Sequence, residues 1–259
     1  MTRALVTGAS SGIGSCFAQC LAEDGNDVVL VGRNEERLSD TAGRIAAMHN
    51  VNAEFVVADL ETDAGVSRVE EILRSKDNPI DFLVNNAGFG IKGDFVETPI
   101  DQHLKMMQVN ALAVLRLTHV ALEEMKARGW GNVLNVSSVA AFTPGVRPSS
   151  TYAASKAFVS AFTEGLAPAM QGTGVHLSVV CPGWTKSAFH ENAGIGASKI
   201  PKLLWLSPQT VARTALSDHY AGKVVSVPGL AYKVILGALR VIPRPVIRVV
   251  SNLAGKLTH

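Results

Sequence analysis

The chain has 259 residues, of which 47% are hydrophobic and 18% are charged. This composition excludes an intrinsically disordered protein, because such chains combine few apolar residues with a high net charge. With 24 basic and 22 acidic residues the net charge is +2, which gives no support for nucleic-acid binding. Three cysteines are too few for a disulfide framework, so we expect a reducing, cytoplasmic environment.

The elements expected in chain order alternate between strand and helix. Short apolar or β-branched runs predict strands at Ala4–Thr7, Asp27–Val31, Ala53–Ala58, Phe82–Val84, Asn132–Val136, His176–Val180 and Val224–Val227. Helix-length segments lie near residues 12–24, 34–49, 62–76, 101–127, 152–170 and 208–221. Several strands are apolar throughout, as strands buried on both faces must be. We therefore predict an α/β fold over residues 1–259: a single Rossmann-like domain with a doubly wound parallel sheet of about seven strands flanked by helices.

Membrane and metal signals are weak. No long apolar stretch precedes the first turn, so we expect no cleaved secretory leader. The sequence also has no run of about 18 consecutive apolar residues, so we expect no membrane-spanning helix. Cys16 and Cys20 lie four residues apart, but no second ligand pair follows at zinc spacing, so we interpret them as packing residues. The seven histidines form no paired-ligand motif, and we predict no metal site.

A glycine-rich turn follows the first strand, in the sequence Thr7-Gly8-Ala9-Ser10-Ser11-Gly12-Ile13-Gly14. Such glycines allow the backbone to approach a pyrophosphate at the start of the next helix, whose free N–H groups and positive dipole end attract phosphate. The plain alternative is an ordinary corner between strand and helix. The position in the first βαβ unit favours a dinucleotide site formed by Gly8, Ser10, Ser11, Gly12, Ile13 and Gly14.

The end of the second strand bears on the choice between NAD and NADP. NAD-binding folds place an acid here for the ribose 2′-hydroxyl, whereas this chain has Gly32 followed by Arg33, with Arg37 one helical turn on. An arginine suits the 2′-phosphate of NADP, although Arg33 would also be unremarkable as a solvated charge at a helix start. We predict NADP (NADPH).

Several short motifs occur in a fixed order, and together they resemble those of the short-chain dehydrogenase/reductase family over residues 3 to about 228. They are the Thr7–Gly14 turn, Asn85-Asn86-Ala87-Gly88, Asn110, Ser138, Tyr152 with Lys156, and Pro182-Gly183. The resemblance implies reversible hydride transfer between NADP(H) and a carbonyl or alcohol.

Tyr152 and Lys156 lie four residues apart, so both side chains project from one face of a predicted helix. A nearby ammonium, together with a positive nicotinamide ring, would lower the pKa of the phenol from its usual value near 10. The resemblance makes Tyr152 the general acid or base. It also implies that Lys156 tunes Tyr152 and holds the nicotinamide ribose. Without the family resemblance, the plainer interpretation of Tyr152 and Lys156 is a half-buried ring under a surface charge.

Two further catalytic residues come from the resemblance. Ser138 would hydrogen-bond the substrate oxygen; it precedes Tyr152 by 14 residues, one more than is usual in the family, and the usual spacing would fall on Val139, which has no hydroxyl. The strand end favours Ser138 over Ser137. Asn110 resembles the asparagine that anchors a water in a proton relay to Lys156, and the alternative is an ordinary helical asparagine.

The remaining cofactor residues are also carried over by resemblance. Asp59 and Leu60 would flank the adenine, although Asp59 could be only a helix cap. Asn86, Ala87 and Gly88 would line the crevice. Cofactor contacts after the sixth strand are expected from Pro182, Gly183, Thr185 and Ser187, the last standing where the family usually has threonine.

The substrate side is less defined. The Gly- and Ala-rich segment 186–206 is our candidate lid. Aromatic and aliphatic residues near it predict an apolar pocket for a hydrophobic ketone of steroid, 3-oxoacyl or aryl type; they are Phe89, Phe142, Trp184, Phe189, Leu203, Leu204 and Trp205. The resemblance also implies a homodimer or homotetramer that pairs through the segments 101–127 and 152–170.

The C-terminal extension, residues 228–259, is basic and apolar. From Lys223 to His259 there are six basic residues and no acid, and Tyr232–Ile242 predicts an apolar helix ended by Pro243. It could make peripheral membrane contact through residues 232–256, or cap the pocket or a neighbouring subunit, which we favour. Two other functions stay open: a non-catalytic NADP-binding regulator, and a membrane-surface interaction protein.

Overall fold

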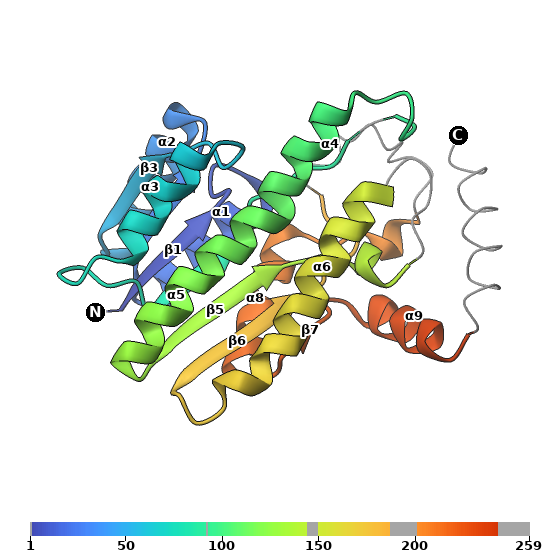
Figure 1. The fold of residues 1–259 in the computed structure, drawn as a ribbon. Coiled ribbons are helices and arrows are strands. Elements are labelled where there is room, and N and C mark those ends of the chain that lie inside the picture. The colour runs from blue at the N-terminus through green and yellow to red at the C-terminus, as the bar shows by residue number, and fades with distance from the viewer. Residues whose placement is uncertain (1, 92, 144–149, 187–200, 243–259) are drawn as a thin grey trace.

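The computed structural model describes residues 2–91, 93–143, 150–186 and 201–242, and seven parallel strands form its central sheet (Figure 1). The strands lie in the order β3-β2-β1-β4-β5-β6-β7. Their bounds are β1 Arg3–Thr7, β2 Asp27–Gly32, β3 Ala53–Val57, β4 Phe82–Asn85, β5 Gly131–Val136, β6 Val175–Val180 and β7 Val225–Ser226. Because β1 pairs with both β2 and β4, the winding direction reverses there. In such sheets, ligands bind outside the carboxyl ends of the strands at this reversal.

Helices cover both faces of the sheet (Figure 1). One face packs on α1 (Gly12–Glu23), α2 (Glu35–His49) and α8 (Pro208–Tyr220). The other packs on α3 (Asp63–Leu73), α5 (Val114–Arg128) and α6 (Ser150–Leu166). The described residues also form α4 Ile100–Met107, the π-helical turn Gln108–Ala113, α9 Leu230–Val241 and the short 3-10 helices η2 Val139–Phe142, η3 Ala167–Met170 and η5 Lys202–Leu204. In the described ranges, no helix is long and apolar enough to cross a membrane.

The strands are apolar throughout because each buries both of its faces. In β1, Ala4 and Val6 pack with α1, whereas Leu5 between them packs with α3 and α5. Burying one leucine fully contributes roughly 1.5–3 kcal/mol. The seven predicted strands are confirmed, each within two residues of its expected ends.

One predicted helix differs in its middle. The segment expected as one helix over 101–127 is α4, then a π-helical turn at Gln108–Ala113, then α5. A π turn inserts one extra residue into the helix and occurs mostly at functional sites. The apolar periodicity continues through this segment, so the sequence pattern does not reveal the insertion.

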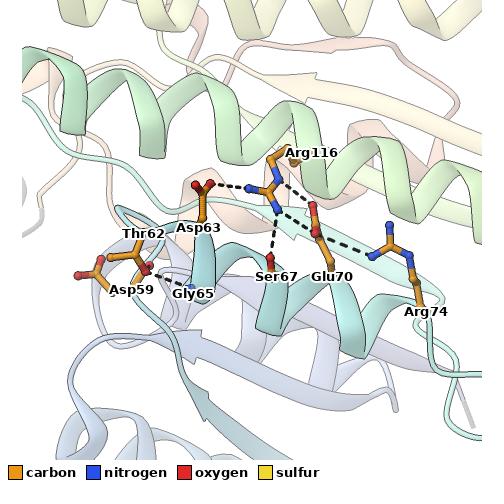
Figure 2. Close-up of polar contacts among 8 residues, drawn as sticks. All are labelled: Asp59, Thr62, Asp63, Gly65, Ser67, Glu70, Arg74 and Arg116. Carbon is orange, nitrogen blue, oxygen red and sulfur yellow. Dashed lines mark hydrogen bonds and ion pairs between the residues drawn. The ribbon is translucent and has the colours of Figure 1, made fainter.

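An ion-paired arginine joins α5 to α3 (Figure 2). Arg116 binds both carboxylate oxygens of Glu70, with Nε–Oε1 and Nη2–Oε2 distances of 2.8 and 2.9 Å, and its Nη1 lies 2.9 Å from Asp63 Oδ1. These contacts lower the pKa of Glu70. A two-pronged contact of this kind fixes geometry more firmly than a single ion pair, so it holds α3 against the helix that follows the π turn.

Candidate active site

The glycine turn after β1 is pinned to the end of β4. Asn86 Nδ2 donates to the carbonyl oxygen of Thr7 at 2.9 Å, and the Thr7 hydroxyl accepts from the backbone N–H groups of Asn86 and Ala87. A β-carbon at Gly8 would stand 2.8 Å from Asn86 Nδ2, and Gly8 has φ +67°, so only glycine suits this position. The two strand ends at the sheet's reversal are therefore locked together.

The N-terminus of α1 faces this turn with its backbone donors uncapped. Ser11 is the N-cap residue of α1 but makes no side-chain capping bond. In contrast, Asn34, Thr62 and Ser207 cap α2, α3 and α8 through their side chains. Free N–H groups at a helix N-terminus are an anion site, so the Gly8–Gly14 turn fits a pyrophosphate.

Arg33, which follows β2 and is expected to hold a 2′-phosphate, already has acidic partners. Arg33 Nη1 lies 2.5 Å from Glu61 Oε1 and 4.0 Å from Asp59 Oδ1. Ser10 lies next to Gly32, its β-carbon 3.6 Å from where a side chain at residue 32 would begin. The sequence pattern identified Arg33 but not Glu61. Arg37 is exposed on the first turn of α2.

Asp59 and Leu60 follow β3, as expected, but they face different ways. Asp59 is half-buried and accepts from the backbone N–H of Glu61 at 3.0 Å, and a side chain at Gly65 would overlap its carbonyl oxygen (Figure 2). Leu60 is buried in the core between the sheet and α3. Only Asp59 of this pair presents a polar group near Arg33.

Tyr152, Lys156 and Ser138 come together where β5 ends and α6 begins. The Ser138 hydroxyl is hydrogen-bonded to the Tyr152 phenol, and Lys156 Nζ lies 5.9 Å from the centre of the Tyr152 ring. Lys156 is buried and donates to the carbonyl oxygen of Val136 at 2.9 Å. The neighbouring Ser137 instead donates to the backbone of Lys156. This arrangement favours Ser138 over Ser137 as the hydroxyl beside the phenol.

Burial dominates the acid–base behaviour of this pair. It raises the pKa of Tyr152 to about 12, against a lowering by the Ser138 hydrogen bond, and it lowers the pKa of Lys156 to about 8. The Tyr152 shift runs opposite to the one expected from the ammonium, because loss of hydration disfavours the phenolate. Without further positive charge, Tyr152 is a neutral phenol and thus a proton donor.

Asn110 lies in the π turn and is fully buried. Its side chain accepts from the backbone N–H of Phe89 at 3.0 Å and donates to the Phe89 carbonyl at 2.9 Å and to Ser155 Oγ at 3.2 Å. A β-carbon at Gly88 would stand 2.9 Å from Asn110 Oδ1 and 3.3 Å from Lys156 Nζ. Asn110 therefore organises the loop after β4 beside Lys156 and does not face solvent.

The turn after β6 is held by a residue that the sequence analysis did not identify. Tyr232 of α9 is buried, accepts from the backbone N–H of Trp184 at 2.9 Å and donates to the carbonyl of Leu204 at 2.6 Å. A side chain at Gly183 would overlap the Tyr232 ring. Thr185 is buried and bridges to Leu206. No local sequence signal links Tyr232 to this turn, 48 residues earlier.

The expected apolar wall is only partly formed by the predicted residues. Trp184 and Trp205 lie with ring centres 6.2 Å apart, near the Tyr232 contact. Leu203 is wrong as a wall residue: its side chain is 84% exposed, because η5 turns it to solvent. Phe89 and Phe142 are partly buried and pack against the hydrophobic core between the sheet and its helices. Ser187, Phe189 and most of the candidate lid lie outside the described residues.

Among the described residues, no group of three or more His, Cys, Asp or Glu side chains could hold a metal ion. Cys20 is buried and Cys16 half-buried on α1 as packing residues, and burial raises the pKa of both thiols.

Comparisons with known proteins identify the family of the chain. Residues 2–196 match the family model described as short chain dehydrogenase. A ketoacyl reductase, HetN, from Nostoc sp. is 33% identical over 82% of this chain and 73% of its own length. A short-chain dehydrogenase from Sphingobium yanoikuyae, solved in complex with NADPH, has 31% identity and a TM-score of 0.84 and covers 93% of this chain and 94% of its own.

A bulky-bulky ketone specific alcohol dehydrogenase from Comamonas testosteroni has 27% identity and a TM-score of 0.78, with 94% of this chain and 96% of that one covered. The sheet order and layers are those of a Rossmann-like fold. The family match over three quarters of the sequence, and the ordered motifs on that fold, lead to one conclusion: the chain belongs to the short-chain dehydrogenase/reductase family and is an oxidoreductase that acts on carbonyl or alcohol substrates.

Proposed function

We propose that the protein interconverts a hydrophobic ketone and its secondary alcohol with NADP(H) as cofactor. The observation that carries the proposal is the convergence of Ser138, Tyr152 and Lys156 at the carboxyl end of β5, next to β4 and the sheet's reversal. When bound there, NADPH supplies the hydride. The protein's own residues would position the substrate and supply or take up the proton.

Each residue has a distinct role in the proposed reaction. The Ser138 hydroxyl would hydrogen-bond the carbonyl oxygen and polarise it. Tyr152, a neutral phenol in the protein alone, would give its proton to that oxygen in reduction and accept it in oxidation. Lys156, held at Val136, would hold the cofactor ribose and favour the phenolate after transfer. Asn110 would keep the loop at Gly88 in place and connect this group to water.

The proposal of NADP over NAD rests on residues at the end of β2. No acid stands at Gly32, Ser10 lies beside it, and Arg33 is next in sequence. The Sphingobium neighbour is described in complex with NADPH. The substrate proposal is supported by the aromatic pair Trp184 and Trp205 and by the bulky-ketone and ketoacyl names of the relatives.

The remaining parts of the proposal follow from the sequence. The chain would act as one domain over residues 1–259, in the cytoplasm, as a homodimer or homotetramer. The cofactor set would be the sequence-predicted one, with Leu60 contributing through its backbone because its side chain is in the core.

The test is NADPH oxidation over a panel of steroids, 3-oxoacyl thioesters and aryl ketones, with NADH in parallel. Tyr152→Phe should lower kcat by at least about 100-fold, the usual size of a general-acid contribution. Tyr220→Phe is the matched control, because Tyr220 is exposed and its hydroxyl donates to Asp24 at 3.4 Å, away from Ser138 and Lys156. A Tyr152→Phe protein as active as the control would instead support a non-catalytic NADP-binding regulator.

A further inference from the structure

Helix α9 has two apolar sides. Tyr232 and Leu236, one turn apart, are buried against the protein. Leu230 and Val234, also one turn apart, are 77% and 64% exposed, and Ile235 is 42% exposed. A helix on the surface of a water-soluble protein normally carries polar residues on its solvent-facing side. The exposed apolar side of α9 therefore indicates a surface that contacts another molecule.

The 3-10 helix η5 lies next to α9 and carries a further exposed aliphatic residue. The bond from the Tyr232 hydroxyl to the Leu204 carbonyl holds η5 against α9, and the neighbouring Leu203 is 84% exposed. We refer to Leu203, Leu230, Val234 and Ile235 as the α9–η5 patch. Exposed aliphatic residues gathered in this way mark sites of protein or membrane contact.

Two exposed lysines stand next to residues of the patch in the sequence. Lys202 precedes Leu203, Lys233 precedes Val234, and both are exposed. The chain from Lys223 to its end carries six basic residues and no acid, and the nearest acid before it, Asp218, is buried against Lys223 and Ser226. An aliphatic surface with basic side chains beside it is complementary to an anionic lipid surface.

A second copy of this chain fits the patch less well. In a twofold dimer the same surface meets itself, which would bring the lysines of both copies face to face. Like charges set against each other across an interface disfavour the complex. The C-terminal residues 243–259 carry the same sign of charge, since they contain Arg244, Arg248 and Lys256 and no acid.

The patch also adjoins the proposed substrate side. Tyr232, on the buried side of α9, holds Trp184 in the turn after β6, and α9 contacts η2, which begins directly after Ser138. We propose that the α9–η5 patch docks the protein on an anionic phospholipid bilayer. If the proposed function holds, a lipophilic ketone would then reach Ser138 and Tyr152 from the bilayer.

The test is co-sedimentation of the full-length protein with vesicles of phosphatidylglycerol and phosphatidylcholine, compared with phosphatidylcholine alone, at low and high salt. We expect binding to the mixed vesicles at low salt, and a loss of about ten-fold or more both without anionic lipid and at high salt. Val234→Glu and Leu230→Glu should each weaken binding by at least about ten-fold, because a carboxylate would enter the lipid-facing side.

Val96→Glu is the matched control, because Val96 is 92% exposed in the loop before α4 and outside the patch. Equal pelleting of Val234→Glu and Val96→Glu, or no pelleting of the wild type, would overturn the proposal. So would a wild-type dimer in solution that Val234→Glu converts to monomer without any vesicle binding, since the patch would then be an interface between copies. A lack of NADPH oxidation with intact vesicle binding would count against the proposed function alone.

Discussion

The ring of Tyr232 lies directly on Gly183, so closely that any side chain at residue 183 would overlap it. The Tyr232 hydroxyl also joins the backbone of Trp184 to that of Leu204. One side chain of α9 therefore holds both Trp184 and Leu204 in place.

Tyr232→Phe should lower the free energy of unfolding by about 1–3 kcal/mol, because it removes the hydroxyl that accepts from the Trp184 N–H and donates to the Leu204 carbonyl. It should also raise the KM for the ketone several-fold while kcat changes little, since Tyr152 and Lys156 are untouched. Urea unfolding and steady-state kinetics measure the two effects. If Tyr232→Phe behaves like the surface variant Tyr220→Phe, the fastening role is refuted.

Gly183→Ala should be destabilising in a way that depends on Tyr232. The new methyl group would push the phenol ring away, and overpacking of this kind costs about 1–3 kcal/mol. In a Tyr232→Ala background the methyl group would have space, so the same substitution should cost much less. A double-mutant cycle in urea measures this coupling, and additive effects would contradict the packing described here.

Arg33 and Glu61 should set the preference between NADPH and NADH in opposite directions. Arg33→Ala should weaken binding of 2′,5′-ADP by about ten-fold, or 1.4 kcal/mol, and leave 5′-AMP nearly unchanged. Glu61→Gln should strengthen 2′,5′-ADP binding several-fold, because its carboxylate competes with the phosphate for Arg33. Calorimetric titration measures both.

The control for this pair is Glu71→Gln, an exposed acid on α3. If Glu61→Gln shows no greater change than this control, general charge removal explains the effect. A wild-type preference for NADH would contradict the role of Arg33 directly.

His219 should make the protein sensitive to acid. It is buried between Ser178 and Asn132, with its ring nitrogens 2.6 and 3.0 Å from their oxygens, and burial lowers its pKa to about 3. The unfolded chain takes up this proton near pH 6.5, so stability is full above that pH and falls as the pH drops toward 3. The loss at pH 4.5 should be about 2–3 kcal/mol.

Urea unfolding at pH 7 and at pH 4.5 measures this loss of stability. His219→Gln should reduce the difference between the two midpoints by the share that His219 contributes. His119→Gln, an exposed histidine on α5, serves as the control. An unchanged pH dependence in His219→Gln would show that other groups cause the acid loss.

The tyrosines should resist ionisation in the protein alone. Burial raises the pKa of Tyr152 and Tyr220 to about 12 and raises that of Tyr232 as well. Absorbance of tyrosinate at 295 nm should therefore stay flat up to about pH 10. Oxidised cofactor should lower only the Tyr152 step, because a nearby cation favours the phenolate. A rise in tyrosinate absorbance below pH 10 without cofactor, if it persists in Tyr152→Phe, would contradict these pKa shifts.

The strands were predictable, and candidate site residues could be identified from the sequence, because both signals are local. An apolar run such as Val28–Val31 predicts a strand buried on both faces, and Tyr152 with Lys156 predicts a shared helix face. The ordered motifs also lead to Ser138, which the structure places at the phenol.

The rest depends on contacts between distant segments. The Arg33–Glu61 pair joins residues 28 apart, and the Tyr232–Trp184 contact joins residues 48 apart. Leu203 carries no sign in its own sequence that η5 turns it outward. Such features arise only once the chain is folded, so a pattern within a short window does not contain them.

The π turn at Gln108–Ala113 fixes the rotational phase of the long helix on either side of it. Each residue advances an α-helix by about 100°, so deleting one residue here would swing either Asn110 off the loop it holds or Leu117 and Val120 out of the core. A change in the length of this stretch therefore cannot be absorbed. Homologues that use the same asparagine should keep the same number of residues between it and the core stripe of α5.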